Sequence, residues 1–211
     1  MFEIELKSKE LTEYVYITVD KDRAEPLYDS DLEQVEDVTL DAFDFIGEPT
    51  DETIYDLVFF KNLKNCMIVN MTISAGEIEI LNKLENLESI QFVNCVFKSD
   101  NKYHMKATEV ILDKCIEANI SLFDEMNTIT KLKIVNCDKV NLKGLENLSN
   151  VTEIYLQNLI LKDIDEVSKL KKLEYINLNG TKVENLTDIV NNPKISVDYE
   201  ELNYIYDGED N

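Results

Sequence analysis

The sequence predicts an α/β repeat fold: a right-handed curved solenoid with a parallel β-sheet on its concave side, 3₁₀ or short helical segments on its convex side and a β-hairpin cap at its N-terminus. Three observations predict this fold. One apolar pattern recurs about every 22 residues, apolar residues occur at every third position between its copies, and the N-terminal segment alternates between apolar and polar residues. Repeats of this length are typical of solenoids, in which each unit buries its apolar face against the next.

Residues 1–31 lie outside the repeats and are expected to form a β cap. Two stretches alternate apolar and polar residues, namely Phe2, Ile4 and Leu6, and then Tyr14, Tyr16 and Thr18. Such alternation is typical of half-buried strands. A hairpin joined through the polar residues 7–13 would cover the first repeat, whose apolar face would otherwise be open to water.

Residues 32–190 hold about seven copies of one frame, with mainly apolar residues at positions 1, 4, 6, 9 and 11. The last copy shows the frame most completely, with Leu173, Ile176, Leu178, Thr181 and Val183. Earlier copies begin at Val35, Leu63, Leu87, Ala107, Ile129 and Val151, so the spacings along the chain are 28, 24, 20, 22, 22 and 22 residues. Chance apolar richness would not keep that register.

The segments between the copies carry a second periodicity. Apolar residues recur at every third position, for example at Leu142, Leu145 and Leu148 before the copy that begins at Val151. A period of three suits a 3₁₀-like arc, whose side chains eclipse at i and i+3, better than a regular α-helix. Each copy is therefore expected to be a short strand followed by a compact arc.

This pattern resembles the leucine-rich-repeat family, and its form of about 22 residues is most similar to the SDS22-like and internalin-like class. The resemblance covers about residues 32–190 and is strongest over residues 120–189. It implies the solenoid fold and says almost nothing about function. The asparagine column usual in the family is replaced here by Phe43, Met71, Cys95, Cys115, Cys137, Leu159 and Thr181. We therefore expect apolar packing, not an asparagine ladder, to hold the turns together.

Residues 191–211 are expected to form a C-terminal cap strand and an acidic tail. Pro193 interrupts the repeat, because proline lacks the N–H that a strand or helix would use. Ile195, Val197 and Tyr199 then alternate as in a last strand.

Four cysteines follow the repeat, at separations of 29, 20 and 22 residues: Cys66, Cys95, Cys115 and Cys137. The last three occupy the same inward position of consecutive copies. Parallel neighbours lie ~4.8 Å apart, a disulfide needs Cβ atoms ~3.8 Å apart with a defined torsion, and a row of thiols cannot surround a metal tetrahedrally. We expect buried, reduced thiols, which favours a cytoplasmic location.

No feature of the sequence predicts an enzyme. His104 is the only histidine and no motif ties it to a serine or cysteine. Phosphate-loop, dinucleotide-binding and zinc-protease motifs are absent, and the acidic clusters lack the spacing of a calcium loop. No stretch approaches the ~18 apolar residues of a membrane helix. We expect no catalytic residue, no metal, no cofactor and no membrane contact.

The predicted concave face carries the candidate binding site. Frame positions 3, 5 and 7 should face solvent, because alternate residues of a strand point to opposite faces. From these positions we select nine residues as partner-binding: Met67, Val69, Gln91, Val93, Ile111, Lys133, Val135, Tyr155 and Tyr175. An exposed apolar patch often marks a partner site. Alternatively, the β-branched residues are there because they suit strands.

The negative charge lies at the two ends of the chain. The formal net charge is −22, yet residues 24–60 hold twelve acids with no lysine or arginine, and residues 198–211 hold six more. Such a field repels nucleic acid and anionic membranes and attracts a basic partner. The same acids could instead keep the ends of a repeat array soluble and apart. The candidate acidic surface consists of Asp29, Asp31, Glu33, Glu36, Asp37 and Asp41.

The sequence therefore favours a non-catalytic module that binds a protein partner, with a monomer as the expected state and no direct contact to nucleic acid. One version is an inhibitor of the antitoxin, immunity or anti-defence type, which covers the basic surface of a nucleic-acid-acting protein. The alternative is a scaffold that holds its partner through the concave apolar face. The abundance of Asn, Ile and Lys resembles proteins of low-GC bacteria or their phages. An enzyme is the least favoured class.

Overall fold

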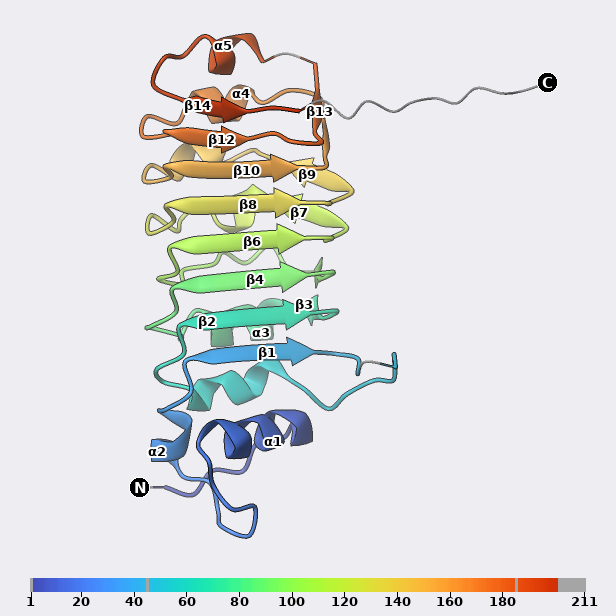
Figure 1. Ribbon diagram of the computed structural model, residues 1–211, viewed down its shortest axis with the longest axis vertical. Helices are drawn as coiled ribbons and strands as arrows, with labels where there is room; N and C mark the ends of the chain where they lie inside the picture. The colour runs from blue at the N-terminus through green and yellow to red at the C-terminus, as the bar shows by residue number, and fades with distance from the viewer. Residues whose placement is uncertain (1, 45, 185, 201–211) are drawn as a thin grey trace, which may run out of the picture.

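The computed structural model describes residues 2–44, 46–184 and 186–200, and it confirms the predicted solenoid (Figure 1). Eight parallel strands form one sheet in the order β1-β2-β4-β6-β8-β10-β12-β14. They are β1 (Asp37–Asp41), β2 (Asn65–Val69), β4 (Ser89–Val93), β6 (Glu109–Asp113), β8 (Lys131–Val135), β10 (Glu153–Gln157), β12 (Tyr175–Asn177) and β14 (Ser196–Asp198). The chain passes behind the sheet after each strand and returns one level higher, which makes each crossover right-handed.

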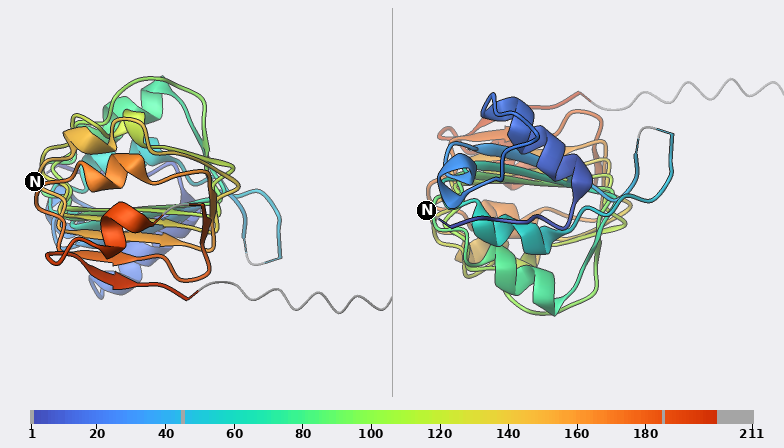
Figure 2. Two further views of the ribbon diagram at one scale, coloured as in Figure 1. Left: turned by 90° about the horizontal axis from the view of Figure 1, so that it is seen from above. Right: turned by 90° about the horizontal axis from the view of Figure 1, so that it is seen from below.

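The strands pair at matching positions of the frame. Val38 lies beside Cys66, and Leu132 lies beside Ile154. Positions 4 and 6 of all seven copies are buried and stack along the solenoid as a continuous apolar core. Figure 2 shows the large sheet along one side of the solenoid and the returning segments along the other. The predicted inward and outward faces of the sheet are thus confirmed.

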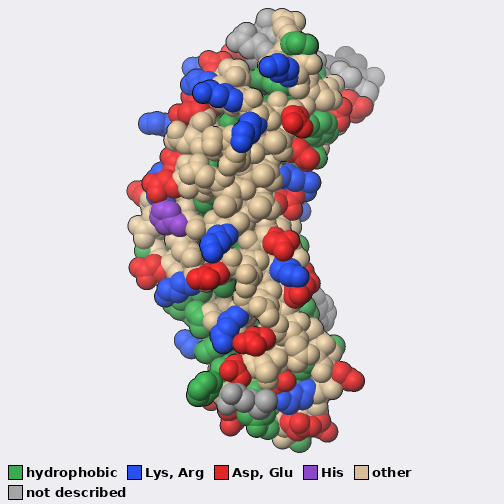
Figure 3. Space-filling view, turned by 90° about the vertical axis from the view of Figure 1, so that its left-hand side faces the viewer, with side chains coloured by type: hydrophobic (Ala, Val, Ile, Leu, Met, Phe, Trp, Pro, Cys, Tyr) green, Lys and Arg blue, Asp and Glu red, His purple; other side chains and the backbone are tan. Residues whose placement is uncertain are grey.

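The returning segments are short, as the period of three indicates. They are η1 (Ile54–Phe59), α3 (Ala75–Leu81), η2 (Ile120–Leu122), η3 (Leu145–Asn147), α4 (Asp165–Ser168) and α5 (Thr187–Val190), of which the three labelled η are 3₁₀ helices. Short strands pair beside them: β3 (Thr72–Ile73) with β5 (Val96–Phe97), β7 (Glu117–Asn119) with β9 (Lys139–Asn141), and β11 (Ile160–Leu161) with β13 (Lys182–Val183). Seen from the side, the molecule is bowed with the large sheet on the inner side of the bend (Figure 3).

The N-terminal cap is helical, so the predicted β-hairpin over residues 1–31 is wrong. The cap consists of α1 (Lys9–Thr18) and α2 (Asp29–Leu32). Ser8 is the N-cap of α1, and its Oγ accepts a hydrogen bond from the Leu11 N–H at 3.0 Å. Leu11 and Val15 are buried and lie four residues apart, which places them on one face of a helix. This helical spacing outweighs the alternation of the neighbouring tyrosines.

A buried carboxylate fastens the cap to the first repeat. Asp56 of η1 is 1% exposed and accepts hydrogen bonds from the backbone N–H groups of Lys7 at 3.0 Å and Ser8 at 2.9 Å. At the other side of α1, the Tyr14 hydroxyl donates to the Asp37 carbonyl oxygen at 2.9 Å. The cap therefore covers the start of the solenoid, although its secondary structure differs from the one expected.

Asparagine ladders do tie turns together, contrary to our expectation, but one position earlier than in the family frame. Asn70, Asn94, Asn136 and Asn158 follow their strands with φ between 50° and 59°, a left-handed conformation that asparagine tolerates better than most residues. The Asn94 side-chain amide donates to Asn70 Oδ1 at 2.6 Å, and Asn158 donates to Asn136 Oδ1 at 2.9 Å. The ladder breaks at Lys114, which takes the same conformation with φ 53°.

We expect Lys114→Asn to raise the free energy of unfolding by on the order of 1 kcal/mol. The left-handed conformation costs most L-residues ~1–2 kcal/mol, and asparagine relieves part of this cost while filling the gap in the ladder. Urea unfolding followed by circular dichroism measures the change. Lys171→Asn, at an exposed lysine without positive φ, is the control. Equal effects of the two substitutions would contradict the explanation.

Thiols occupy the column that holds asparagine in the family. Cys95, Cys115 and Cys137 are buried and free, like Cys66. The Sγ atoms of Cys95, Cys115 and Cys137 each donate to a main-chain oxygen of the preceding turn, for example Cys95 to Ile68 O at 3.3 Å. Burial raises the pKa of Cys95 to about 11. These inward cysteines are core side chains with weak hydrogen bonds, as the repeat spacing predicts.

Aromatic side chains fill the middle of the solenoid. Phe92 contacts Phe97 with ring centroids 5.2 Å apart, and Tyr103 stacks on Phe123 at 4.6 Å. Tyr103 comes from the irregular segment 98–108, which replaces a helix in this turn. Its hydroxyl has no hydrogen-bond partner within the described chain, and burial raises its pKa. The aromatic stack substitutes for the missing helix.

The C-terminal end of the described chain contains the strand that the sequence predicts. β14 is the last strand that Ile195, Val197 and Tyr199 predict, and it pairs with β12. The acidic tail over residues 201–211 lies outside the described residues.

Candidate functional site

The nine predicted binding residues all lie on the concave face of the large sheet, and all are half-buried. Five of them form one row across the strands in register: Met67, Gln91, Ile111, Lys133 and Tyr155. Val69, Val93 and Val135 belong to the next row, where Asp113 interrupts the valines. Tyr175 lies beside Glu153 in the third row. The apolar surface is therefore mixed with polar and charged side chains.

Lysines and carboxylates neutralise one another on the C-terminal half of this face. Lys133 forms an ion pair with Glu109 at 2.9 Å, and Lys131 lies 3.6 Å from both Glu109 and Glu153. Both lysine ammonium groups lie 5.4 Å from the centre of the Tyr155 ring, within cation–π range. These contacts fix the orientation of Tyr155 and leave little uncompensated charge around it.

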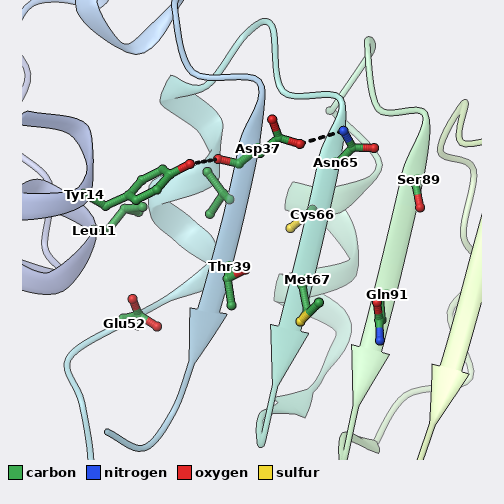
Figure 4. Close-up of a pocket in the computed structure, with 11 residues that line it drawn as sticks. Leu11, Tyr14, Asp37, Thr39, Glu52, Asn65, Cys66, Met67, Ser89 and Gln91 are labelled. Carbon is green, nitrogen blue, oxygen red and sulfur yellow. Dashed lines mark hydrogen bonds between the residues drawn. The ribbon is translucent and has the colours of Figure 1, made fainter. Parts of the chain in front are cut away.

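A hollow of about 430 Å³ lies at the N-terminal half of the same face, between α1 and the first three strands (Figure 4). Leu11 and Tyr14 come from α1, Glu52 comes from the segment after β1, and the other lining residues are Asp37, Val38, Thr39, Asn65, Cys66, Met67, Ser89 and Gln91. The hollow exists because α1 stands beside the edge strand of the sheet. The sequence predicted Met67, Gln91 and Asp37 as functional but gave no signal for Glu52 or Tyr14.

Glu52 is the most perturbed carboxylate of this hollow. Partial burial raises its pKa to about 7, and the nearby carboxylates of Glu10, Asp41 and Asp51 raise it further, against the effect of a hydrogen bond from the Asp41 N–H. A cation close to Glu52 would favour its ionised form and lower its pKa.

The raised pKa of Glu52 makes stability depend on pH. The folded protein keeps this proton up to about pH 7, whereas the unfolded chain releases it near 4.5, so stability falls as pH rises between these values. We expect Glu52→Gln, which keeps an acceptor for the Asp41 N–H, to raise stability at pH 8 by on the order of 1 kcal/mol, since half-exposure weakens the effect. Thermal midpoints at pH 5 should be nearly equal. A gain that is the same at both pH values would contradict this cause.

The six predicted acidic surface residues do not form one exposed patch. Glu36 and Asp37 are exposed, whereas Asp29, Asp31, Glu33 and Asp41 are half-buried. Asp29 accepts the Phe2 N–H at 3.0 Å, and Asp31 pairs with Lys21. Neutralising Asp29 or Asp31 would therefore remove contacts that hold the N-terminal cap.

Other candidate chemistry is sparse in the described part of the chain. His104 lies 3.6 Å from Glu125 on an exposed surface. Residues 2–44, 46–184 and 186–200 contain no cluster of three or more His, Cys, Asp or Glu side chains suited to a metal ion. None of the helices described has the length and apolar character that a membrane crossing needs.

Comparison with known proteins agrees with the repeat pattern. No family model matches the sequence. The chain is 33% identical over 81 residues to acidic leucine-rich nuclear phosphoprotein 32 family member A of Drosophila melanogaster, and 32% identical over 80 residues to the protein of that name from Drosophila pseudoobscura pseudoobscura. The matches cover 37% of this chain, and the chain spans only 31% and 30% of these relatives.

Solved structures show the same architecture over almost the whole chain. Internalin C2 of Listeria monocytogenes superposes with a TM-score of 0.54 at 17% identity, covering 92% of this chain and 93% of that one. The internalin InlF of the same organism gives a TM-score of 0.60 at 13% identity, covering 92% and 63%. These likenesses concern the fold alone. With the in-register frame, the parallel concave sheet and the short arcs, they show that the chain has the leucine-rich-repeat fold.

Proposed function

We propose that the chain is a non-catalytic module that binds another protein on its concave face. The observation that carries the proposal is the uncovered inner face of the eight-stranded sheet, on which half-buried apolar, aromatic and charged side chains stand together. A face of this composition resembles a protein interface, where aromatic residues sit among polar groups. The relatives and structural neighbours are leucine-rich-repeat proteins, which supports a binding role.

We expect Val93→Glu combined with Tyr155→Glu to abolish capture of the partner from the native source. Two carboxylates would be buried at the interface without partners, which costs several kcal/mol. The thermal midpoint should change little, because both side chains lie on the concave face of the sheet and not in the core of the free protein. The control replaces Ile116 and Ile160, exposed apolar residues away from the large sheet, with glutamate. Capture that survives the concave substitutions would place the site elsewhere.

In its specific form, we propose an acidic inhibitor that covers the basic surface of a nucleic-acid-acting protein, of the antitoxin, immunity or anti-defence type. The run of twelve acids without a base over residues 24–60 supports it, as does the hollow lined by Asp37 and Glu52. A bacterial or phage source and action in the cytoplasm as a monomer belong to this proposal. A scaffold that binds through apolar contacts is the alternative, which the row of concave valines favours.

Salt dependence separates the inhibitor from the scaffold. Glu33, Glu36 and Asp37 can be changed to Gln, Gln and Asn without removing a side-chain contact that holds the cap, because Tyr14 bonds to the main-chain oxygen of Asp37. The matched control neutralises Glu85, Glu117 and Asp138, which are exposed and lie away from the large sheet. An inhibitor should lose affinity and show a weaker salt dependence with the first set only. Equal affinity and salt slope for both sets would leave the scaffold.

A further inference from the structure

The hollow beside α1 differs in charge compensation from the rest of the concave face. Glu109 and Glu153 on the C-terminal half have lysine partners. Within the described residues, Asp37 and Glu52 form no ion pair, and the stretch 24–60 that carries both contains no lysine or arginine. The face is thus neutralised at one end and carries uncompensated negative charge at the other.

The lining of the hollow combines apolar and acidic groups. Met67 and the ring of Tyr14 contribute apolar surface, whereas Asp37, Glu52 and Gln91 contribute side-chain oxygens from three directions (Figure 4). A side chain that fits both parts needs an apolar stem and a cationic head. Lysine and arginine have this construction, and they commonly lay their methylene groups on apolar surface while the head reaches polar groups.

We propose that this hollow receives a lysine or arginine side chain of the partner protein, with its stem against Tyr14 and Met67 and its cationic head against the carboxylate of Glu52. The inference rests on the proposed function, because it names the group by which a basic partner is held on the concave face. A cation at this place would offset the mutual repulsion of Glu52 with Glu10, Asp41 and Asp51, none of which forms an ion pair within the described residues.

Two small probes test the proposal on the full chain without the partner. N-acetyl-arginine methylamide carries the cationic head, and N-acetyl-citrulline methylamide is its neutral analogue of nearly the same shape. Backbone amide signals of the ¹⁵N-labelled protein report binding. We expect the arginine probe to shift the signals of Thr39, Met67 and Gln91 in a saturable way, and the citrulline probe to leave them unchanged at the same concentration.

Matched variants locate the charge that matters. Glu52→Gln should weaken binding of the arginine probe at least about fivefold, because a charge-assisted hydrogen bond is lost. Glu85→Gln removes the same charge from an exposed position outside the hollow and should leave binding unchanged. Glu52→Gln keeps the acceptor for the Asp41 N–H, and an unchanged signal pattern of the free variant verifies its fold.

The proposal is overturned by equal binding of the two probes, by equal binding of the arginine probe to the two variants, or by shifts that cluster away from β1, β2 and β4. These results are independent of the capture experiment with Val93 and Tyr155. Normal probe binding together with unaffected capture by the Val93 and Tyr155 variant would overturn the proposed concave site while supporting the cation-binding hollow. Lost capture by that variant, together with failed binding of the arginine probe, would support the concave site and overturn the cation-binding hollow.

Discussion

Replacing Phe92 with alanine is expected to lower the free energy of unfolding by about 3–5 kcal/mol, the usual range for a fully buried phenylalanine. Phe92 of β4 is 0% exposed, and its ring meets Phe97, Tyr103 and Phe123 at centroid distances of 5.2, 5.8 and 6.3 Å. The segment 98–108 packs Tyr103 against Phe92 without forming a helix, so the truncation also removes a partner ring of Tyr103. Urea unfolding followed by circular dichroism measures the loss.

The control for Phe92 is Ile160→Ala, at a side chain that is 84% exposed. It should change stability by less than about 0.5 kcal/mol. Since a domain of this kind is stable by about 5–15 kcal/mol, the loss at Phe92 would be a large fraction of the total. A loss below about 1 kcal/mol would mean that the aromatic stack contributes little to the middle turns.

Replacing Asp56 with alanine is expected to cost about 2–4 kcal/mol. The carboxylate is buried and accepts the N–H groups of Lys7 and Ser8, and each buried donor left without an acceptor costs ~1–3 kcal/mol. Because Ser8 is the N-cap of α1, the helix should loosen together with the cap. Hydrogen exchange of the α1 amides should therefore rise more than that of β8.

Asp51→Ala is the matched control for Asp56→Ala. The Asp51 carboxylate also accepts a backbone N–H, that of Lys9 at 3.0 Å, but in an exposed place where water can replace it. Its replacement should cost less than about 0.5 kcal/mol. If both aspartates have the same effect, burial is not the reason for the importance of Asp56.

The large sheet could be predicted almost residue by residue because one period controls it. Inward residues recur at the same two positions of each copy, and a slip of one residue would move all of them into water. The same constraint predicts one row on the concave face, formed by frame position 5 of successive copies: Met67, Gln91, Ile111, Lys133 and Tyr155. The period does not predict how much of each side chain its neighbours cover, and in the structure all five are half-buried.

The repeat period predicts neither the N-terminal helix nor the position of the asparagine ladder. In residues 9–18 the apolar and aromatic residues 14–17 follow one another without a break, which masks the four-residue spacing of Leu11 and Val15. In the family frame the ladder stands at the ninth position, whereas in this chain Asn70, Asn94 and their equivalents stand at the eighth. The hollow depends on both α1 and the long segment after β1, and neither belongs to the repeat.

The four cysteines have a practical consequence for following how the protein opens. Cys66, Cys95, Cys115 and Cys137 lie in four successive turns and are all buried, and burial raises the pKa of Cys66 to about 12. Alkylating reagents attack the exposed thiolate, so each cysteine is modified only when its own turn separates from the next. The rate of alkylation at each position, read by mass spectrometry, therefore reports the order in which the turns come apart, and no label has to be introduced.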